Sequence, residues 1–112
     1  MKTITVVIGA TLALLVAQRS SADEISAEAQ RAAQRAAVTT CATCHGPQGR
    51  SVVPKFPTLA GQHQNYLAAQ LKAFKAQTRG DPDALGYMWG MAAPLDDEMI
   101  EALAAYYAAQ SP

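Results

Sequence analysis

Apolar and polar residues recur along this chain with the spacing of helices rather than of strands. From Ser26 to about Thr40 the sequence is rich in alanine, the strongest intrinsic helix former, and its charged residues fall on one face, which predicts a first helix. The opposite face has little bulk and lets another element approach closely. That face consists of Ala29, Ala32, Ala33, Ala36 and Ala37.

Two more helices are predicted towards the C-terminus. The first spans about Asn65 to Thr78, where apolar residues recur at helical spacing, and it ends before Gly80. The second begins after Asp96, a residue suited to cap a first turn. The residues predicted to face the core are Leu67, Leu71 and Phe74 in one helix and Ile100, Leu103 and Tyr107 in the other, with Leu95 placed to contact Ile100 across the helix start.

Glycine and proline interrupt the chain in two places. Residues 45–62 and 81–94 both carry several of these residues, at a density that predicts loops. No segment alternates apolar and polar residues for long enough to indicate a strand. The fold class predicted from this pattern is therefore all-α.

The first 22 residues have the pattern of an export signal. Lys2 supplies a positive charge, residues 4–16 form an almost uninterrupted apolar run, and residues 20–22 are small, as expected before a cleavage site. An uncleaved membrane anchor is the alternative, but the run is shorter than the roughly 20 residues that span a bilayer. We expect residues 1–22 to be a signal peptide and residues 23–112 to be one periplasmic domain without a membrane span.

Length and charge limit the classes of function that fit this chain. A domain of residues 23–112 buries little apolar surface, so a cofactor or another staple is expected to complete its core. The whole chain has a formal net charge of zero. Without Lys2 and Arg19, seven basic residues remain against nine acidic ones, which leaves a net charge of minus two. This balance argues against nucleic acid as a partner.

The motif that carries chemistry is Cys41-Ala42-Thr43-Cys44-His45, which holds both cysteines of the chain. Two thiols at this spacing can add across the two vinyl groups of one haem and form thioethers, and the histidine that follows is then held at the iron as proximal ligand. Export agrees with this, because covalent haem attachment in bacteria is completed outside the cytoplasm. The motif therefore predicts one covalently attached haem c with His45 as an iron ligand.

Three other interpretations of the motif fit less well. A dithiol oxidoreductase places Cys-x-x-Cys at a helix start beside a βαβ pattern, which this sequence lacks. A structural zinc site needs four ligands, and beyond the three in the motif only His63 is available. A disulfide between cysteines so close in sequence would close a very small loop and add little stability.

The sixth iron ligand decides between electron transfer and the binding of small molecules. Met99 lies within the predicted last helix, where a place in the core is expected, and His63 is expected to be solvated. Met88 and Met91 both lie in the breaker-rich segment that could fold over the opposite face of the haem. Spacing alone does not separate these two methionines.

These features together resemble class I c-type cytochromes, over essentially the whole chain after the predicted signal. The sequence is most similar to the bacterial cytochrome c4 and c-553 group in Cys44-His45-Gly46, in Phe56-Pro57-Thr58-Leu59-Ala60-Gly61-Gln62, in Tyr66, Gln70-Leu71 and Phe74-Lys75, and in Leu95-Asp96-Asp97-Glu98 with Leu103-Ala104-Ala105-Tyr106-Tyr107. The resemblance implies a small class I cytochrome c fold of roughly three to four helices wrapped around one haem. The best-known members carry two haem domains in tandem, whereas this sequence has one Cys-x-x-Cys-His motif.

The resemblance also assigns roles to single residues. The carbonyl of Pro57 would accept a hydrogen bond from the far ring nitrogen of His45 and so fix the orientation of that ligand. In this group the distal methionine lies seven residues before the leucine that opens the last helix. That leucine corresponds to Leu95, so the resemblance points to Met88 as the iron ligand and leaves Met91 as its rival.

Further residues are expected around the haem. Apolar side chains would raise the reduction potential by disfavouring the extra charge of ferric iron, and Arg79 would pair with a propionate. The expected apolar haem contacts are Leu59, Tyr66, Leu71, Phe74 and Trp89. Tyr106 would lie where the first and last helices cross. Basic residues that could dock an acidic partner at the haem edge are Arg50, Lys55, Lys72 and Lys75.

Histidine and methionine ligands together leave no vacant position on the iron, which favours one-electron transfer over catalysis. We therefore expect an electron carrier, not an enzyme, between redox protein partners such as a dehydrogenase and a terminal oxidase or reductase. One alternative is a five-coordinate haem protein that binds small ligands or acts as a peroxidase. Another is the cytochrome subunit of a dehydrogenase or sulfur-oxidising complex, in which only the partner differs.

Overall fold

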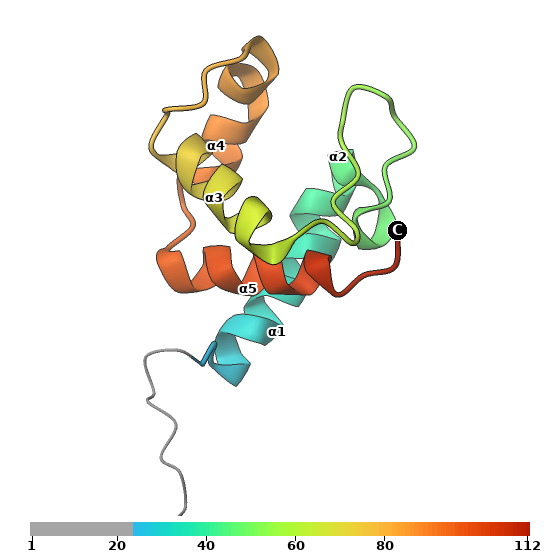
Figure 1. Ribbon diagram of the computed structural model, residues 1–112, viewed down its shortest axis with the longest axis vertical. Helices are drawn as coiled ribbons and strands as arrows, with labels where there is room; N and C mark the ends of the chain where they lie inside the picture. Colours follow the sequence, from blue (N-terminus) through green and yellow to red (C-terminus); the bar gives the residue numbers. More distant parts are fainter. Residues whose placement is uncertain (1–23) are drawn as a thin grey trace, which may run out of the picture.

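The computed structural model describes residues 24–112, and the predicted signal peptide lies outside this part of the chain. Within it the chain forms helices and loops and no strand, as the apolar pattern predicts (Figure 1). The elements in chain order are α1 (Ala27–Ala36), η1 (Ala37–Cys41), α2 (Ala42–His45), η2 (Pro47–Gly49), α3 (Gln64–Lys75), η3 (Ala84–Met88), α4 (Trp89–Ala92) and α5 (Asp97–Ala108). η1 and η3 are π-helical turns, and η2 is a 3₁₀ turn.

The core forms where α5 packs against both α1 and α3 (Figure 1). Alanine fills much of it, and among residues 24–112 Ile100 is the largest side chain that is fully buried. The buried residues of this main core are Ala33, Ala37, Leu67, Ala68, Ile100, Ala102, Leu103, Ala104 and Tyr107, and Tyr106 is partly buried against them. The alanine face of the first helix therefore allows the close approach of α5.

The first helix runs further than its predicted end near Thr40. The helical path continues from α1 through η1 and α2 to His45, so the Cys-x-x-Cys-His motif lies on a helix. The wide turn at η1 takes up one extra residue, and the Thr39 hydroxyl donates to the carbonyl of Arg35 at 2.8 Å. Gly46, with a φ of 79°, ends the helix where no other residue type fits easily.

The last helix begins as predicted. The Asp96 carboxylate accepts a hydrogen bond from the backbone N–H of Met99 at 2.8 Å, which is the geometry of an N-cap. Leu95 packs against the main core that contains Ile100. Both contacts fix the direction in which the chain enters α5.

We expect Asp96→Ala to lower the free energy of unfolding by about 1 kcal/mol, because the variant leaves a helix N–H without its acceptor. Asp97→Ala is the matched control. It removes the same charge from the first turn without removing a capping bond, and should cost roughly 0.3–0.5 kcal/mol. Chemical denaturation of the haem-loaded protein, followed by circular dichroism, measures both. Equal losses in the two variants would contradict the capping role.

The loop predicted for residues 81–94 is wrong over most of its length, because residues 82–92 are helical. Pro82 lies in the first turn, where a missing N–H costs nothing, and Gly86 and Gly90 are accommodated inside the helical segment. The Asp81 carboxylate accepts from the N–H of Ala84 at 2.9 Å and so supports the start of this segment. This cap and the packing of Ala84 and Ala92 against Phe74 outweigh the unfavourable helix propensity of glycine.

The loop predicted over residues 45–62 is confirmed for most of its length. Its backbone closes on itself, because the Gly49 carbonyl accepts from the N–H groups of Leu59 and Ala60. The loop is also tied to the end of the last helix, since the N–H of Gly61 donates to the Tyr107 carbonyl at 3.0 Å. Within residues 24–112, no helix has the length and apolarity that a bilayer crossing requires.

Candidate functional site

The two cysteines lie at the end of η1 and within α2, three positions apart on one helical path. Residues at this spacing project from the same face of a helix, so both sulfur atoms can reach one flat partner. Neither cysteine is in a disulfide, and both are half-buried. Burial raises the pKa of the Cys41 thiol, and the neighbouring Tyr107 side chain partly opposes that rise.

His45 closes the same helix and is buried, with 8% of its surface exposed. Its Nδ1 lies 2.8 Å from the carbonyl oxygen of Pro57, so this ring nitrogen donates and its proton is fixed there. The ring of Phe56 meets the imidazole edge-on, with centroids 6.4 Å apart. Because Nδ1 carries the proton, Nε2 is left with a free lone pair, as a metal-binding imidazole requires.

The candidate sixth ligands occupy different surroundings. Met88 ends η3 and is half-buried against a second, smaller apolar cluster whose buried members are Phe74, Ala84 and Ala92. Met91, on α4, is 53% exposed. Met99 packs against the main core from α5, and His63 is exposed just before α3. Met88 is thus the methionine of the 82–92 segment that is already packed inward.

Contacts that the sequence did not suggest link the loop beside His45 to the segment that carries Met88. The rings of Phe56 and Tyr87 meet edge-on with centroids 5.9 Å apart. Lys55 pairs with Asp83 at 3.2 Å and lies 5.1 Å from the centre of the Tyr87 ring. These pairs join residues about thirty positions apart, which a local sequence pattern does not reveal. The only sequence signal near them is the run of large side chains at Tyr87-Met88-Trp89.

The other side chains predicted to contact the haem do not form one cluster in the structure. Leu59 and Leu71 are partly buried against the main core, whereas Phe74 is buried in the smaller cluster with Trp89 packed beside it. Tyr66 is 51% exposed. These placements leave their roles towards a haem as predictions.

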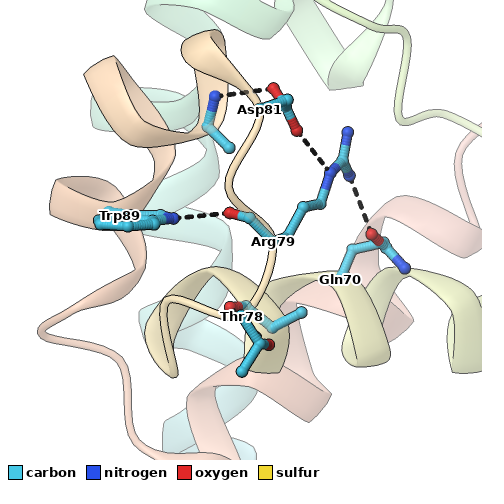
Figure 2. Close-up of polar contacts among 7 residues, drawn as sticks. Gln70, Thr78, Arg79, Asp81 and Trp89 are labelled. Carbon is cyan, nitrogen blue, oxygen red and sulfur yellow. Dashed lines mark hydrogen bonds and ion pairs between the residues drawn. The ribbon is translucent and has the colours of Figure 1, made fainter.

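Arg79, predicted to pair with a propionate, already has partners within the chain (Figure 2). Its guanidinium bonds the Asp81 carboxylate at 3.0 Å and the Gln70 amide oxygen at 2.9 Å. With the capping bond to Ala84, this ion pair holds the pKa of Asp81 below its usual range. The Trp89 indole N–H donates to the Arg79 carbonyl at 2.7 Å.

The four basic residues proposed for docking also have partners within the chain. Lys55 pairs with Asp83, and Lys72 pairs with Glu101 at 2.6 Å, contacts that raise the pKa of each ammonium group. Lys75 donates to the carbonyl of Leu95. Arg50 donates to the Ser111 carbonyl at 2.7 Å and to Gln48. The charges are therefore partly neutralised or fixed, which weakens the expectation of a free basic docking face.

The described residues fit a haem. The core has alanine where large side chains would be expected, while Tyr66, Leu85, Tyr87 and Met91 are large and exposed on α3, η3 and α4. The Tyr107 hydroxyl is buried beside the Cys41 thiol and has no nitrogen or oxygen partner. Residues 24–112 hold no group of three or more His, Cys, Asp or Glu side chains arranged for a metal ion alone. Cys41, Cys44 and His45 instead supply two thioether sulfurs and one imidazole, the donor set of haem c.

Comparison with known proteins agrees with this site. The family model described as cytochrome c matches residues 29–109. Cytochrome c-552 of Acidithiobacillus ferridurans is 46% identical over 100 residues, which cover 88% of this chain and 43% of that protein. The thiosulfate dehydrogenase electron acceptor of Stutzerimonas stutzeri (strain A1501) is 42% identical over 81 residues, which cover 71% of this chain and 37% of that protein.

A solved structure of a relative has a similar fold. The cytochrome c4 structure of Acidithiobacillus ferrooxidans superimposes with a TM-score of 0.61 at 49% identity, over 64% of this chain and 42% of the other. This chain therefore spans less than half the length of these relatives. The matched region includes the Cys-x-x-Cys-His motif and α5, so the fold and the covalent haem c come with it. The chain belongs to the cytochrome c family.

Proposed function

We propose that this protein is a periplasmic mono-haem cytochrome that carries single electrons between redox proteins, with His45 and Met88 as the axial ligands of its iron. When bound, haem c supplies an iron centre that gains and loses one electron. The observation that carries the proposal is the 2.8 Å contact between His45 Nδ1 and the Pro57 carbonyl, which leaves Nε2 free for a metal. Cys41 and Cys44 would hold the porphyrin through thioethers.

The surroundings of Met88 support its assignment over Met91. Met88 packs with Trp89 against the small cluster around Phe74, whereas Met91 is mostly exposed. A side chain that is already held by its neighbours loses less entropy when it becomes a ligand. Two ligands that stay in place in both oxidation states keep structural change during electron transfer small, and thioether ligation with an apolar shell favours a positive midpoint potential.

The ferric near-infrared spectrum tests the ligand assignment, through the charge-transfer band that a methionine sulfur gives when bound to haem iron. We expect the band in the wild type and in Met91→Ala, and its complete loss in Met88→Ala. The Met88→Ala protein should then bind carbon monoxide or cyanide readily. A wild-type protein that lacks the band and has a high-spin ferric spectrum would instead support the five-coordinate, ligand-binding alternative. Loss of the band in Met91→Ala alone would transfer the ligand role to that residue.

The identity of the partner is a separate part of the proposal. Relatives named as thiosulfate dehydrogenase electron acceptors support a role in accepting electrons from a dehydrogenase of sulfur compounds. Purified haem-loaded protein, mixed with a thiosulfate dehydrogenase and thiosulfate, would be reduced at a rate that saturates with cytochrome concentration. Absence of reduction, in a protein with the near-infrared band, would limit the proposal to a carrier for other partners.

A further inference from the structure

The segment that carries Met88 is held on both sides by contacts that lead to Arg79 (Figure 2). On one side the indole Nε1 of Trp89 donates to the Arg79 carbonyl at 2.7 Å. On the other side Asp81 accepts from the N–H of Ala84 through Oδ1 at 2.9 Å and from Arg79 Nε through Oδ2 at 3.0 Å. Ala84 begins η3 and Trp89 begins α4, so Met88 lies between the two points of attachment.

Arg79 is in turn fixed to α3. Its Nη1 donates to the Gln70 amide oxygen at 2.9 Å, and its guanidinium lies 4.7 Å from the centre of the Phe74 ring. A planar guanidinium with several partners in different directions has little freedom to rotate. We call Gln70, Arg79, Asp81 and Trp89 the Arg79 brace, because together they connect α3 to both halves of the helical segment at residues 82–92.

The segment needs such support. η3 is a π-helical turn of five residues, a geometry that is rare and is found frequently at functional sites. The apolar cluster beside it has only three buried members, of which two are alanines. Apolar packing on this side of the molecule is therefore limited, and directional hydrogen bonds decide where the end of η3 lies.

We propose that the Arg79 brace positions Met88 and determines how firmly its sulfur is kept at the iron. The proposal rests on the Met88 ligation proposed above. When the brace is weakened, the segment spends more time displaced, and an added ligand then competes better for the iron. The apparent affinity of that ligand equals its intrinsic affinity multiplied by the fraction of molecules in which the position is open.

Imidazole binding to the ferric, haem-loaded protein measures this fraction. Trp89→Phe keeps an aromatic ring but removes the N–H donor, and should lower the apparent Kd for imidazole about threefold to tenfold, the factor that corresponds to one lost hydrogen bond. Asp81→Asn keeps an acceptor for Ala84 but loses the charge that holds Arg79. It should change the Kd in the same direction and by less, because the ion pair is exposed to solvent.

Asp97→Asn is the control, since it makes the same change of charge on α5, outside the brace. It should bind imidazole as the wild type does, and both it and Asp81→Asn should keep the near-infrared band before imidazole is added. Wild-type imidazole affinity in both brace variants would overturn the proposal, even if their unfolding midpoints fell, because the brace would then be purely structural. Retention of the band in Met88→Ala would overturn the ligation proposal instead, which is a different failure.

Discussion

Replacing both Cys41 and Cys44 with serine is expected to remove all covalently bound haem from the protein. Neither cysteine forms a disulfide, and both project from one helical face just before His45. A serine hydroxyl does not form the thioether that cysteine forms with a vinyl group, so haem could be held only by its axial ligands. Haem staining after denaturing electrophoresis, with the mass of the intact protein, measures the covalent fraction.

Each single variant should keep at most one thioether, with a lower yield of haem-loaded protein. Thr43→Ser is the matched control, because Thr43 lies between the two cysteines on the exposed side of the helix and should leave attachment unchanged. Covalent haem in the double variant would show that another side chain forms the bond.

Replacing Gly46 with alanine is expected to have the largest effect on stability. Gly46 follows His45 directly and has a φ of 79° with a ψ of 171°, a conformation that is essentially confined to glycine. A Cβ there would stand 2.0 Å from the carbonyl oxygen of Arg50, so the backbone would have to move. We expect a loss of about 3 kcal/mol or more in the free energy of unfolding, and a lower haem yield because His45 moves with it.

Gly90→Ala serves as the control for Gly46→Ala. Gly90 lies in α4, and apart from its chain neighbours and its own helix backbone no described atom comes within 4 Å of the position that its Cβ would take. Because alanine is the better helix former, the variant should be as stable as the wild type or more stable by up to about 1 kcal/mol. Denaturant titrations of the two variants under the same conditions measure the difference. Similar losses at both positions would contradict the steric argument at Gly46.

Much of this fold could be predicted from the sequence because its signals are local. The alanine face of the first helix, the helical spacing in α3 and the Asp96 cap of α5 each depend on residues a few positions apart. The helical course of residues 82–92 could not be predicted in this way, because one proline and two glycines there each indicate a loop. What overrides them is the Asp81 cap together with the packing of Ala84 and Ala92 against Phe74 of α3.

In the candidate site, too, local features could be predicted and contacts between distant segments could not. The motif at residues 41–45 could be recognised because its chemistry depends on the spacing of adjacent residues, and the covalent haem c follows from it. The contacts of Phe56 with Tyr87 and of Trp89 with Arg79 could not be predicted, since they depend on how separate segments fold together. The docking role given to the lysines was weakened for the same reason, because Asp83 and Glu101 meet them only in the folded chain.

Because the two apolar clusters differ in size, we expect residues 82–92 to open locally before the molecule unfolds as a whole. The main core joins α1 to α5, and the N–H of Ser26 donates to Glu98 across 72 positions of sequence, so opening this core requires the chain to give up its longest-range contacts. The cluster beside η3 is much smaller. Local opening of residues 82–92 therefore costs less free energy than global unfolding. If Met88 is the distal ligand, as proposed, its exchange would then be a sub-global event in which the helix that holds His45 stays folded.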